Sequence, residues 1–458
     1  MEAGLFRFLR FSLGLEGEVK GLLDGRKGSF DWDACYQFAK RQTLVGVLFD
    51  GIQRLPKELA PARPLLLRWL SDSESIRRRN MRMDRASAYI YNKVCAAGFR
   101  CCILKGQGNA LLYPHPSSRI PGDVDVWVMA NREELRHIAL SLTEGDGSSL
   151  QESLNHIGLT VHGVSVELHS TPALLNSPLH NSRLQKWLKR NADLQCSNRI
   201  ALPNNAGEVA VPTLSFNIIY QLCHLFHHCF YEGVGLRQIV DYYFVLKNTD
   251  FSGNTDGVSG NTDRDEVFLN TDYTDFTDRF SGNTDEVCFL LNTDCSDLTD
   301  RVDGKTEKHS CDLGDSCSSS LTTDSSGLMD GLVVTEELSG LQEELKWLGL
   351  WEFAGAVMYV LREVMGLDEK RMICAPDERR GRLLLEEIMA GGNFGHYDTR
   401  NHFGQGALWH NIQRFRRDWR MLRFYPSEAL SEPLFRACHF LWRWKQKHTG
   451  KPKERNRN

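Results

Sequence analysis

Two short segments in the first half of the chain alternate apolar and acidic residues, and they constrain the fold most strongly. In GDVDVWV at 122–128, Asp123 and Asp125 fall on one face and the valines on the other. In VSVELH at 164–169, Glu167 lies on the face opposite the valines. This alternation predicts two half-buried strands, and pairing of both strands in one sheet would bring three carboxylates together.

The sequence around these strands has a helical period. Apolar residues recur at three- and four-residue steps between residues 1 and 98 and again after Thr213. A short apolar run, 101–104, predicts a further strand, and Asn131 is a helix cap followed by two glutamates. The expected fold class is therefore α+β, a small mixed β-sheet between N-terminal and C-terminal helical regions.

The charge of the chain is divided unevenly along its 458 residues, although the total is only −4. Residues 248–330 contain 19 acidic and 5 basic side chains, a net of −14, and six copies of Asn-Thr-Asp. Such a composition predicts a disordered insertion. Calcium binding by its aspartates is a less favoured alternative, because no EF-hand spacing is present.

These patterns predict five regions along the chain. They are an N-terminal helical region (1–98), an α/β core with the two alternating strands (99–212), helices completing the core (213–247), the acidic insertion (248–335), and a C-terminal helical region with a basic tail (336–458).

Three carboxylates on neighbouring strands indicate a cation site. Asp123, Asp125 and Glu167 would repel one another strongly unless a cation neutralised them. Hard oxygen ligands select Mg²⁺ or Mn²⁺. Two such ions can activate a hydroxyl, hold a triphosphate and stabilise a leaving pyrophosphate.

The order of the motifs resembles that of the bacterial uncharacterised nucleotidyltransferase family, a branch of the polymerase-β-like nucleotidyltransferase superfamily. The resemblance rests on LKG (104–106), YPHP (113–116), Arg119, GDVDVW (122–127), VELH (166–169) and GLRQIVD (235–241). It implies that Asp123 and Asp125 ligate both metals and that Glu167 is the third catalytic carboxylate. The superfamily's usual Gly-Ser turn is replaced here by Lys105-Gly106-Gln107-Gly108, so phosphate contacts do not transfer by position.

A second group of residues is predicted to bind the nucleotide. Its members are Lys105, Gly106, Gly108, Arg119, Arg237 and Asp241. Each has a plainer interpretation: the lysine could be an exposed turn residue, Arg119 could pair with a carboxylate, and Arg237 could pair with Asp241 one helical turn away.

Three further motifs favour structural interpretations. The histidines at 224, 227 and 228 have helical spacing, and packed or hydrogen-bonded roles are favoured over zinc. The glycine loop at 391–395 is explained by helix termination as well as by substrate contact. The stripe of Ile412, Phe415, Trp419 and Leu422 is predicted to be core, with Arg414, Arg417 and Arg420 on a solvated basic face.

The sequence therefore predicts a cytoplasmic, metal-dependent nucleotidyltransferase that moves a nucleotidyl group from an NTP to an acceptor hydroxyl. The acceptor could be a small molecule, a protein or RNA. No membrane span is expected, and nucleic acid would bind the C-terminal basic region, which carries +9 over 401–458. Two alternatives stay open: a catalytically inactive nucleotidyltransferase-like binding domain and a toxin-like enzyme that modifies tRNA.

Overall fold

The computed structural model describes residues 2–17, 30–145, 150–249, 330–398, 400 and 407–449. One compact unit comprises Met1–Thr249 with Ser339–Asn458, and Asp250–Leu338 forms the other. The first unit contains the sheets and helices considered below. The predictions of disorder and of calcium binding for the acidic insertion fall on residues outside those described.

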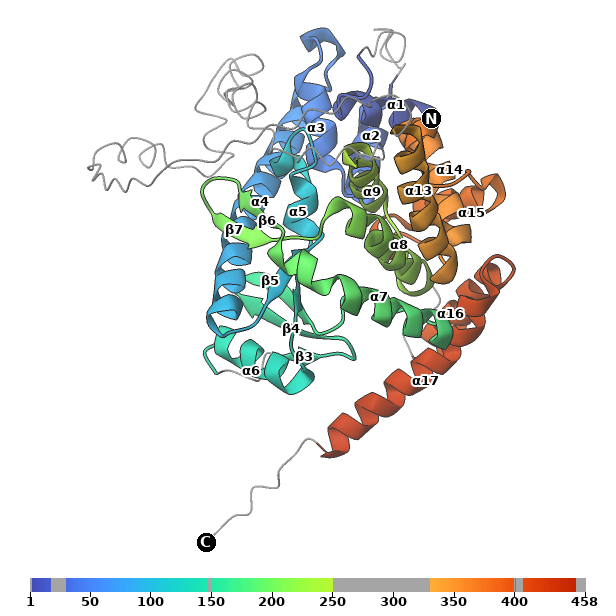
Figure 1. Cartoon of the computed structure of the whole chain (residues 1–458). Helices are drawn as coiled ribbons and strands as arrows, with labels where there is room; N and C mark the ends of the chain where they lie inside the picture. Colours follow the sequence, from blue (N-terminus) through green and yellow to red (C-terminus); the bar gives the residue numbers. More distant parts are fainter. Residues whose placement is uncertain are drawn as a thin grey trace, which may run out of the picture. The chain divides into compact units, whose positions relative to one another are not determined.

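A five-stranded mixed sheet lies in the first unit, which confirms the predicted α+β class (Figure 1). Its strand order is β1-β2-β5-β4-β3, with β2 and β5 parallel and the other neighbours antiparallel. The strands are β1 (Cys101–Leu104), β2 (Val124–Val128), β3 (Gln151–Glu152), β4 (His156–Val161) and β5 (Val164–His169).

Local sequence explains where these elements begin and turn. The tight β4–β5 connection is made by His162 and Gly163, which both have positive φ, at 49° and 73°. Asn131 caps the helix after β2 by accepting bonds from the Glu133 and Glu134 amides, and the Glu134 side chain binds back to the Asn131 amide. This capping box fixes the direction in which the chain leaves β2.

Helices cover both faces of the sheet. The long α4 and the capped α6 pack on the valine face, while Trp127 on the opposite face stacks on Phe216 at the start of α8, with ring centroids 5.9 Å apart. A two-stranded hairpin packs along α4. These elements are α4 (Arg63–Ala96), α5 (Gly106–Ala110), α6 (Arg132–Leu142), α7 (Pro178–Ser197), β6 (Arg199–Leu202), β7 (Gly207–Ala210) and α8 (Leu214–Tyr231).

The helices at the two ends of the chain pack together. Arg10 on α1 donates to the Val364 carbonyl at the end of α14 over 3.1 Å. The buried Gln42 donates to the Ile388 carbonyl in α15 and accepts from the Leu236 amide of α9. The helices concerned are α1 (Glu2–Ser12), α2 (Trp32–Arg41), α3 (Val45–Gln53), α9 (Leu236–Asn248), α13 (Asp330–Trp347), α14 (Trp351–Met365) and α15 (Glu378–Gly391).

The last two helices, α16 (Ala407–Leu422) and α17 (Pro426–Thr449), correct one prediction. Phe415 and Trp419 were expected in the core, but they are 62% and 67% exposed. Asp418 and Met421 are buried residues of this helix instead, and Arg436 of α17 pairs with Asp418. Of the helices described, none is long and apolar enough to cross a membrane.

Removing the acidic insertion tests how far the first unit depends on it. We expect a variant lacking Phe251 to Gly327 to fold with nearly unchanged stability, because the contacts of α9 with α14 and its hydrogen bond to Gln42 lie outside the deletion. Shortening a connection changes mainly loop entropy, about 0.6 kcal/mol per twofold change in length. Thermal melting of the two proteins checks this, and a fall in Tm of more than about 5 °C would contradict it.

Candidate functional site

The predicted carboxylates meet at the ends of the two central strands. Since β2 and β5 are parallel neighbours, Asp125 lies directly opposite Glu167, and Asp123 lies just before β2. One oxygen from each of the three carboxylates lies within 4.8 Å of the others. The structure therefore brings together the three residues that the sequence assigned to metal binding, with an all-oxygen donor set suited to Mg²⁺ or Mn²⁺.

Two cationic groups bind the central carboxylate. Lys105 Nζ lies 2.9 Å from one oxygen of Asp125, and His169 Nε2 lies 2.9 Å from the other. The same His169 nitrogen is 3.3 Å from Glu167. A nitrogen between two carboxylate oxygens must carry a proton, because carboxylate oxygens only accept hydrogen bonds. The charge of the cluster is thus balanced in part by the chain itself.

These contacts shift the pKa values of the two aspartates in opposite directions. Burial opposes ionisation of Asp125, but Lys105 and His169 outweigh it and hold the pKa of Asp125 well below its usual range. The charge of Asp125, together with burial, raises the pKa of Asp123 to about 6. Burial disfavours the imidazolium form of His169, yet hydrogen bonds to Asp125 and Glu167 raise the pKa of His169 to about 9.

A row of histidines on α8 extends from the lysine. Lys105 Nζ lies 3.0 Å from His224 Nε2, which is 3.0 Å from His228 Nε2. Burial and the charge of Lys105 hold the pKa of His224 well below its usual value, so the ring is neutral and accepts the lysine's hydrogen bond. The favoured interpretation, hydrogen-bonded rather than zinc-binding histidines, agrees with these contacts.

Asp123 and Asp125 open into a cleft of about 510 Å³, part of it open to solvent. Asp123 and Asp125 form one wall, and α8, α9 and the Lys105-Gly106 turn form the others. The remaining lining residues are Asn109, Arg119, Gly122, Gln221, His224, Leu225, Arg237, Gln238, Asp241 and Phe394. Five of the six predicted nucleotide-binding residues therefore line the cleft. Their role in binding a nucleotide stays a prediction.

A buried ion pair supports the far wall of the cleft. Arg119 donates two hydrogen bonds to Asp241, of 2.7 and 2.8 Å, and Tyr113 donates a third of 2.7 Å. Arg237 instead donates to the Ile120 carbonyl over 2.8 Å. The simple pairing of Arg237 with Asp241 within one helix is therefore not the hydrogen bond that forms, because Arg119 reaches Asp241 from the loop before β2.

The turn after β1 has an unusual backbone. Lys105 and Gly106 have positive φ angles of 47° and 32°, which directs the lysine toward Asp125. Gly108 is absent from the cleft wall, and a Cβ there would lie 3.1 Å from Val211. Close packing explains this glycine. Gln107 donates a short hydrogen bond to the buried Asp84 of α4 and so anchors the turn.

The burial of Asp84 gives a pH-dependent prediction. Burial raises the pKa of Asp84 to about 6, so the folded protein binds a proton more tightly than the unfolded chain. Stability is then lost as the pH rises from about 4 to about 6. We expect Asp84→Asn, which keeps an oxygen for Gln107, to stabilise the protein by about 1–3 kcal/mol at pH 8 and by less at pH 5.

Urea denaturation of wild type and variant at both pH values measures this difference. Asp193→Asn is the matched control, since the Asp193 side chain is 78% exposed. A stabilisation that is equal at pH 5 and pH 8 would contradict the proposed cause.

The cleft also receives a side chain from far along the sequence. Phe394, in the short turn η7 (Asn393–Gly395), lines it and lies 5.1 Å from His228 between ring centroids. The turn can approach α8 closely because residue 395 is glycine: a Cβ there would lie 2.1 Å from the Glu232 carbonyl oxygen. The glycine loop thus approaches the site, in addition to ending α15.

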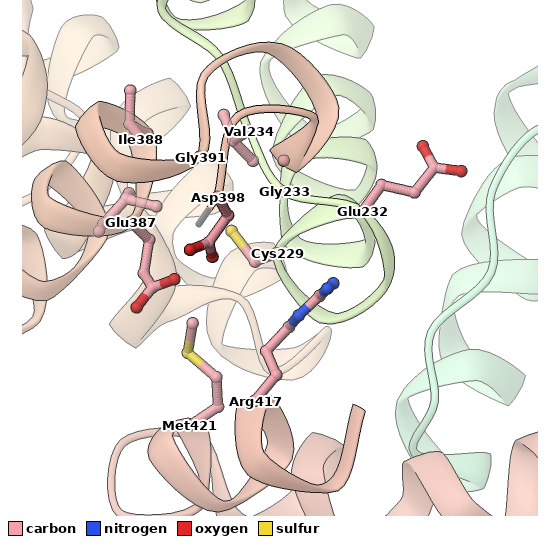
Figure 2. A pocket seen from close by; sticks show the side chains of 12 residues that line it. Cys229, Glu232, Gly233, Val234, Glu387, Ile388, Gly391, Asp398, Arg417 and Met421 are labelled. Carbon is pink, nitrogen blue, oxygen red and sulfur yellow. The ribbon is translucent and has the colours of Figure 1, made fainter. Parts of the chain in front are cut away.

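A second cavity, of about 400 Å³ including its open part, lies behind this loop (Figure 2). Figure 2 shows Glu387, Asp398 and Arg417 directed into it from α15, the following loop and α16. Arg400 binds both Glu387 and Asp398, at 2.8 Å each. Glu387 and Asp398 are thus paired with arginine, and the third acid of this cavity, Glu232, lies 3.2 Å from His228.

Sequence reasoning missed the histidines beside the carboxylates. His169 follows Glu167 by two residues, so the alternation that placed the glutamate also placed this ring on the same face. His156 is opposite His169 on β4. For His156 the only available signal was strand register, which a single sequence does not define for β4 and β5 beyond their tight turn.

Two aspartates at the start of one strand and a third carboxylate on its parallel neighbour agree with the arrangement that the sequence resemblance implies. A model described as "Uncharacterised nucleotidyltransferase" matches residues 28–259, about half of the chain, and the chain belongs to this family. No curated protein and no solved structure matches it. The match contains all three carboxylates.

Proposed function

We propose that the protein transfers a nucleotidyl group from an NTP to an acceptor hydroxyl and releases pyrophosphate. The observation that carries the proposal is the convergence of Asp123, Asp125 and Glu167, of which the two aspartates line a cleft, in a member of a nucleotidyltransferase family. The three carboxylates would hold Mg²⁺ or Mn²⁺. Such an ion supplies neutralisation of the triphosphate charge and acidification of a bound hydroxyl.

The chain's own groups orient the reactants. The acceptor oxygen forms a bond to the α-phosphorus, the bond from that phosphorus to the bridging oxygen breaks, and pyrophosphate leaves. A carboxylate of the cluster accepts the hydroxyl proton. Arg237 and Lys105 are the cationic side chains that line the cleft beside the carboxylates, and Arg119 keeps its charge within the ion pair with Asp241. Positioning and charge, without a covalent enzyme intermediate, supply the rate enhancement.

A second candidate is a domain that binds without catalysis. It is favoured by one observation: Lys105 and His169 bind the two oxygens of Asp125 and so offset part of the negative charge of the cluster from within the chain. A third, transfer to tRNA, is favoured by the exposed Arg443, Trp444 and Lys445 of α17, since adjacent basic and aromatic side chains suit RNA.

Transfer of label from an NTP tests these proposals. The purified chain is incubated with each α-labelled NTP, with Mg²⁺ or Mn²⁺ and a cell lysate, and the products are treated separately with nuclease and protease. We expect label on one class of acceptor. The same NTP labelled on the γ-phosphate is the control, and adding the chain should transfer no more of this label than the lysate does alone, because that phosphate leaves in pyrophosphate.

Nuclease-sensitive label in the tRNA fraction would support the third candidate. If no NTP gives label with either metal, and if Asp123→Asn leaves metal and nucleotide affinity unchanged, the transferase proposal is wrong.

A further inference from the structure

The site face of the sheet continues beyond the three carboxylates. On β4 and β5, His156 lies opposite His169, and Gly158 lies opposite Glu167. His156 and Glu167 are therefore diagonal neighbours on the β4–β5 pair. Two imidazoles and one carboxylate therefore occupy adjacent positions.

The atoms of this second group are close enough to share one ion. His156 Nε2 is 3.5 Å from one oxygen of Glu167, and His169 Nε2 is 3.3 Å from the other. One ligand atom from each of the three residues lies within 4.8 Å of the others. Glu167 belongs to both groups, so its two oxygens can bridge from the acidic cluster to the histidines.

The donor set of this second group differs from that of the first. Two imidazole nitrogens and a carboxylate suit Zn²⁺, Mn²⁺, Co²⁺ and other transition-metal ions, whereas Mg²⁺ prefers oxygen ligands and retains several waters. Two ions joined by a carboxylate, roughly 3.5–4 Å apart, are a common arrangement for displacement at phosphorus.

We propose that His156, Glu167 and His169 form a second cation position, selective for a transition-metal ion, that shares Glu167 with the acidic cluster. This proposal rests on the proposed function only in sharing Glu167 with it. Cation binding is measured without any nucleotide. The proton that His169 holds between the carboxylates leaves when the ion binds.

Binding of Co²⁺ to the full chain, freed of metal with a chelator, tests the proposal. Imidazole and carboxylate ligands give Co²⁺ visible absorption bands that the hydrated ion shows only weakly, and competition with Zn²⁺ or Mn²⁺ gives their affinities. We expect one such site, which millimolar Mg²⁺ does not displace. His156→Ala should weaken it at least about tenfold, since even the loss of an outer hydrogen-bonding partner costs 10–100-fold.

Matched variants isolate the site from the other histidines and cysteines. His137→Ala removes an exposed histidine of α6 and should leave the bands unchanged. His156→Asn serves if the alanine variant melts early. Equal Co²⁺ affinity in wild type and both His156 variants, or no bands at all, overturns the proposal.

The outcome separates this proposal from that of nucleotidyl transfer. Label transfer that proceeds with Mg²⁺ in a protein without a Co²⁺ site would overturn the second cation position alone. A Co²⁺ site that is lost in His156→Ala, in a protein that transfers no label, would support the cation position and count against the transferase.

Discussion

Replacing Asp123 by asparagine is expected to lower kcat/KM for nucleotidyl transfer by about 10³-fold, equivalent to ~4 kcal/mol of transition-state stabilisation. Asparagine keeps the size of the side chain but removes one of the three negative charges that hold the cation. Asp123 is the cleanest choice because the described ion pairs of the cluster, to Lys105 and His169, are made by Asp125 and Glu167.

The same variant should fold at least as stably as wild type when no divalent cation is present. The charge of Asp125 is the main cause of the raised pKa of Asp123, so the two carboxylates repel in the folded state. Added Mg²⁺ should raise the Tm of wild type and leave that of the variant unchanged.

Initial rates with the labelled NTP and melting curves with and without cation measure both effects. Asp193→Asn, on the exposed surface of α7, is the control for the substitution itself. Full activity in Asp123→Asn would exclude this aspartate from the cation site, and a large fall in Tm would assign the loss of activity to misfolding.

Breaking the buried pair of Arg119 and Asp241 is expected to cost about 3–5 kcal/mol of stability for either single change. Their side chains are only 3% and 6% exposed, so removing one partner leaves a charge buried without its counter-ion. Arg119→Met and Asp241→Leu combined should cost less than the sum of the two single changes, because the double variant buries neither charge.

Denaturation with guanidinium of the two single variants and the double variant measures the coupling energy. The surface pair of Arg100 and Asp193 provides a matched control: its atoms are also 2.7 Å apart, but the side chains are 61% and 78% exposed. The corresponding changes there should cost less than ~1 kcal/mol. Additive effects at Arg119 and Asp241 would show that the pair does not act as a unit.

The strands and their faces were predictable because alternation is a local property. The sequence of β2 and β5 placed Asp125 and Glu167 on the site face, and the asparagine cap placed α6. Parallel pairing of the two strands then brought the carboxylates together. The alternation and the cap need no knowledge of distant parts of the chain, whereas the pairing of β2 with β5 joins strands that are separated by α6, β3 and β4.

Partners that depend on tertiary packing were not predictable. Helical spacing offered Arg237 as the partner of Asp241, whereas the fold supplies Arg119 from a loop. The apolar stripe of α16 gave no information about what covers it, and Trp419 is exposed. Phe394 reaches the carboxylates across more than 200 residues, a separation over which a sequence pattern carries no geometric signal.

The position of Phe394 has a consequence for how the cleft is assembled. The family match ends at residue 259. Phe394, which lines the cleft, follows the acidic segment in the sequence and lies on a loop that packs against α8 and follows α15. If the protein were produced as two polypeptides, 1–249 and 330–458, the second would have to bind the first before Phe394 could line the cleft. The fraction of molecules with a complete cleft would then increase with the concentration of the fragments, as in any bimolecular equilibrium.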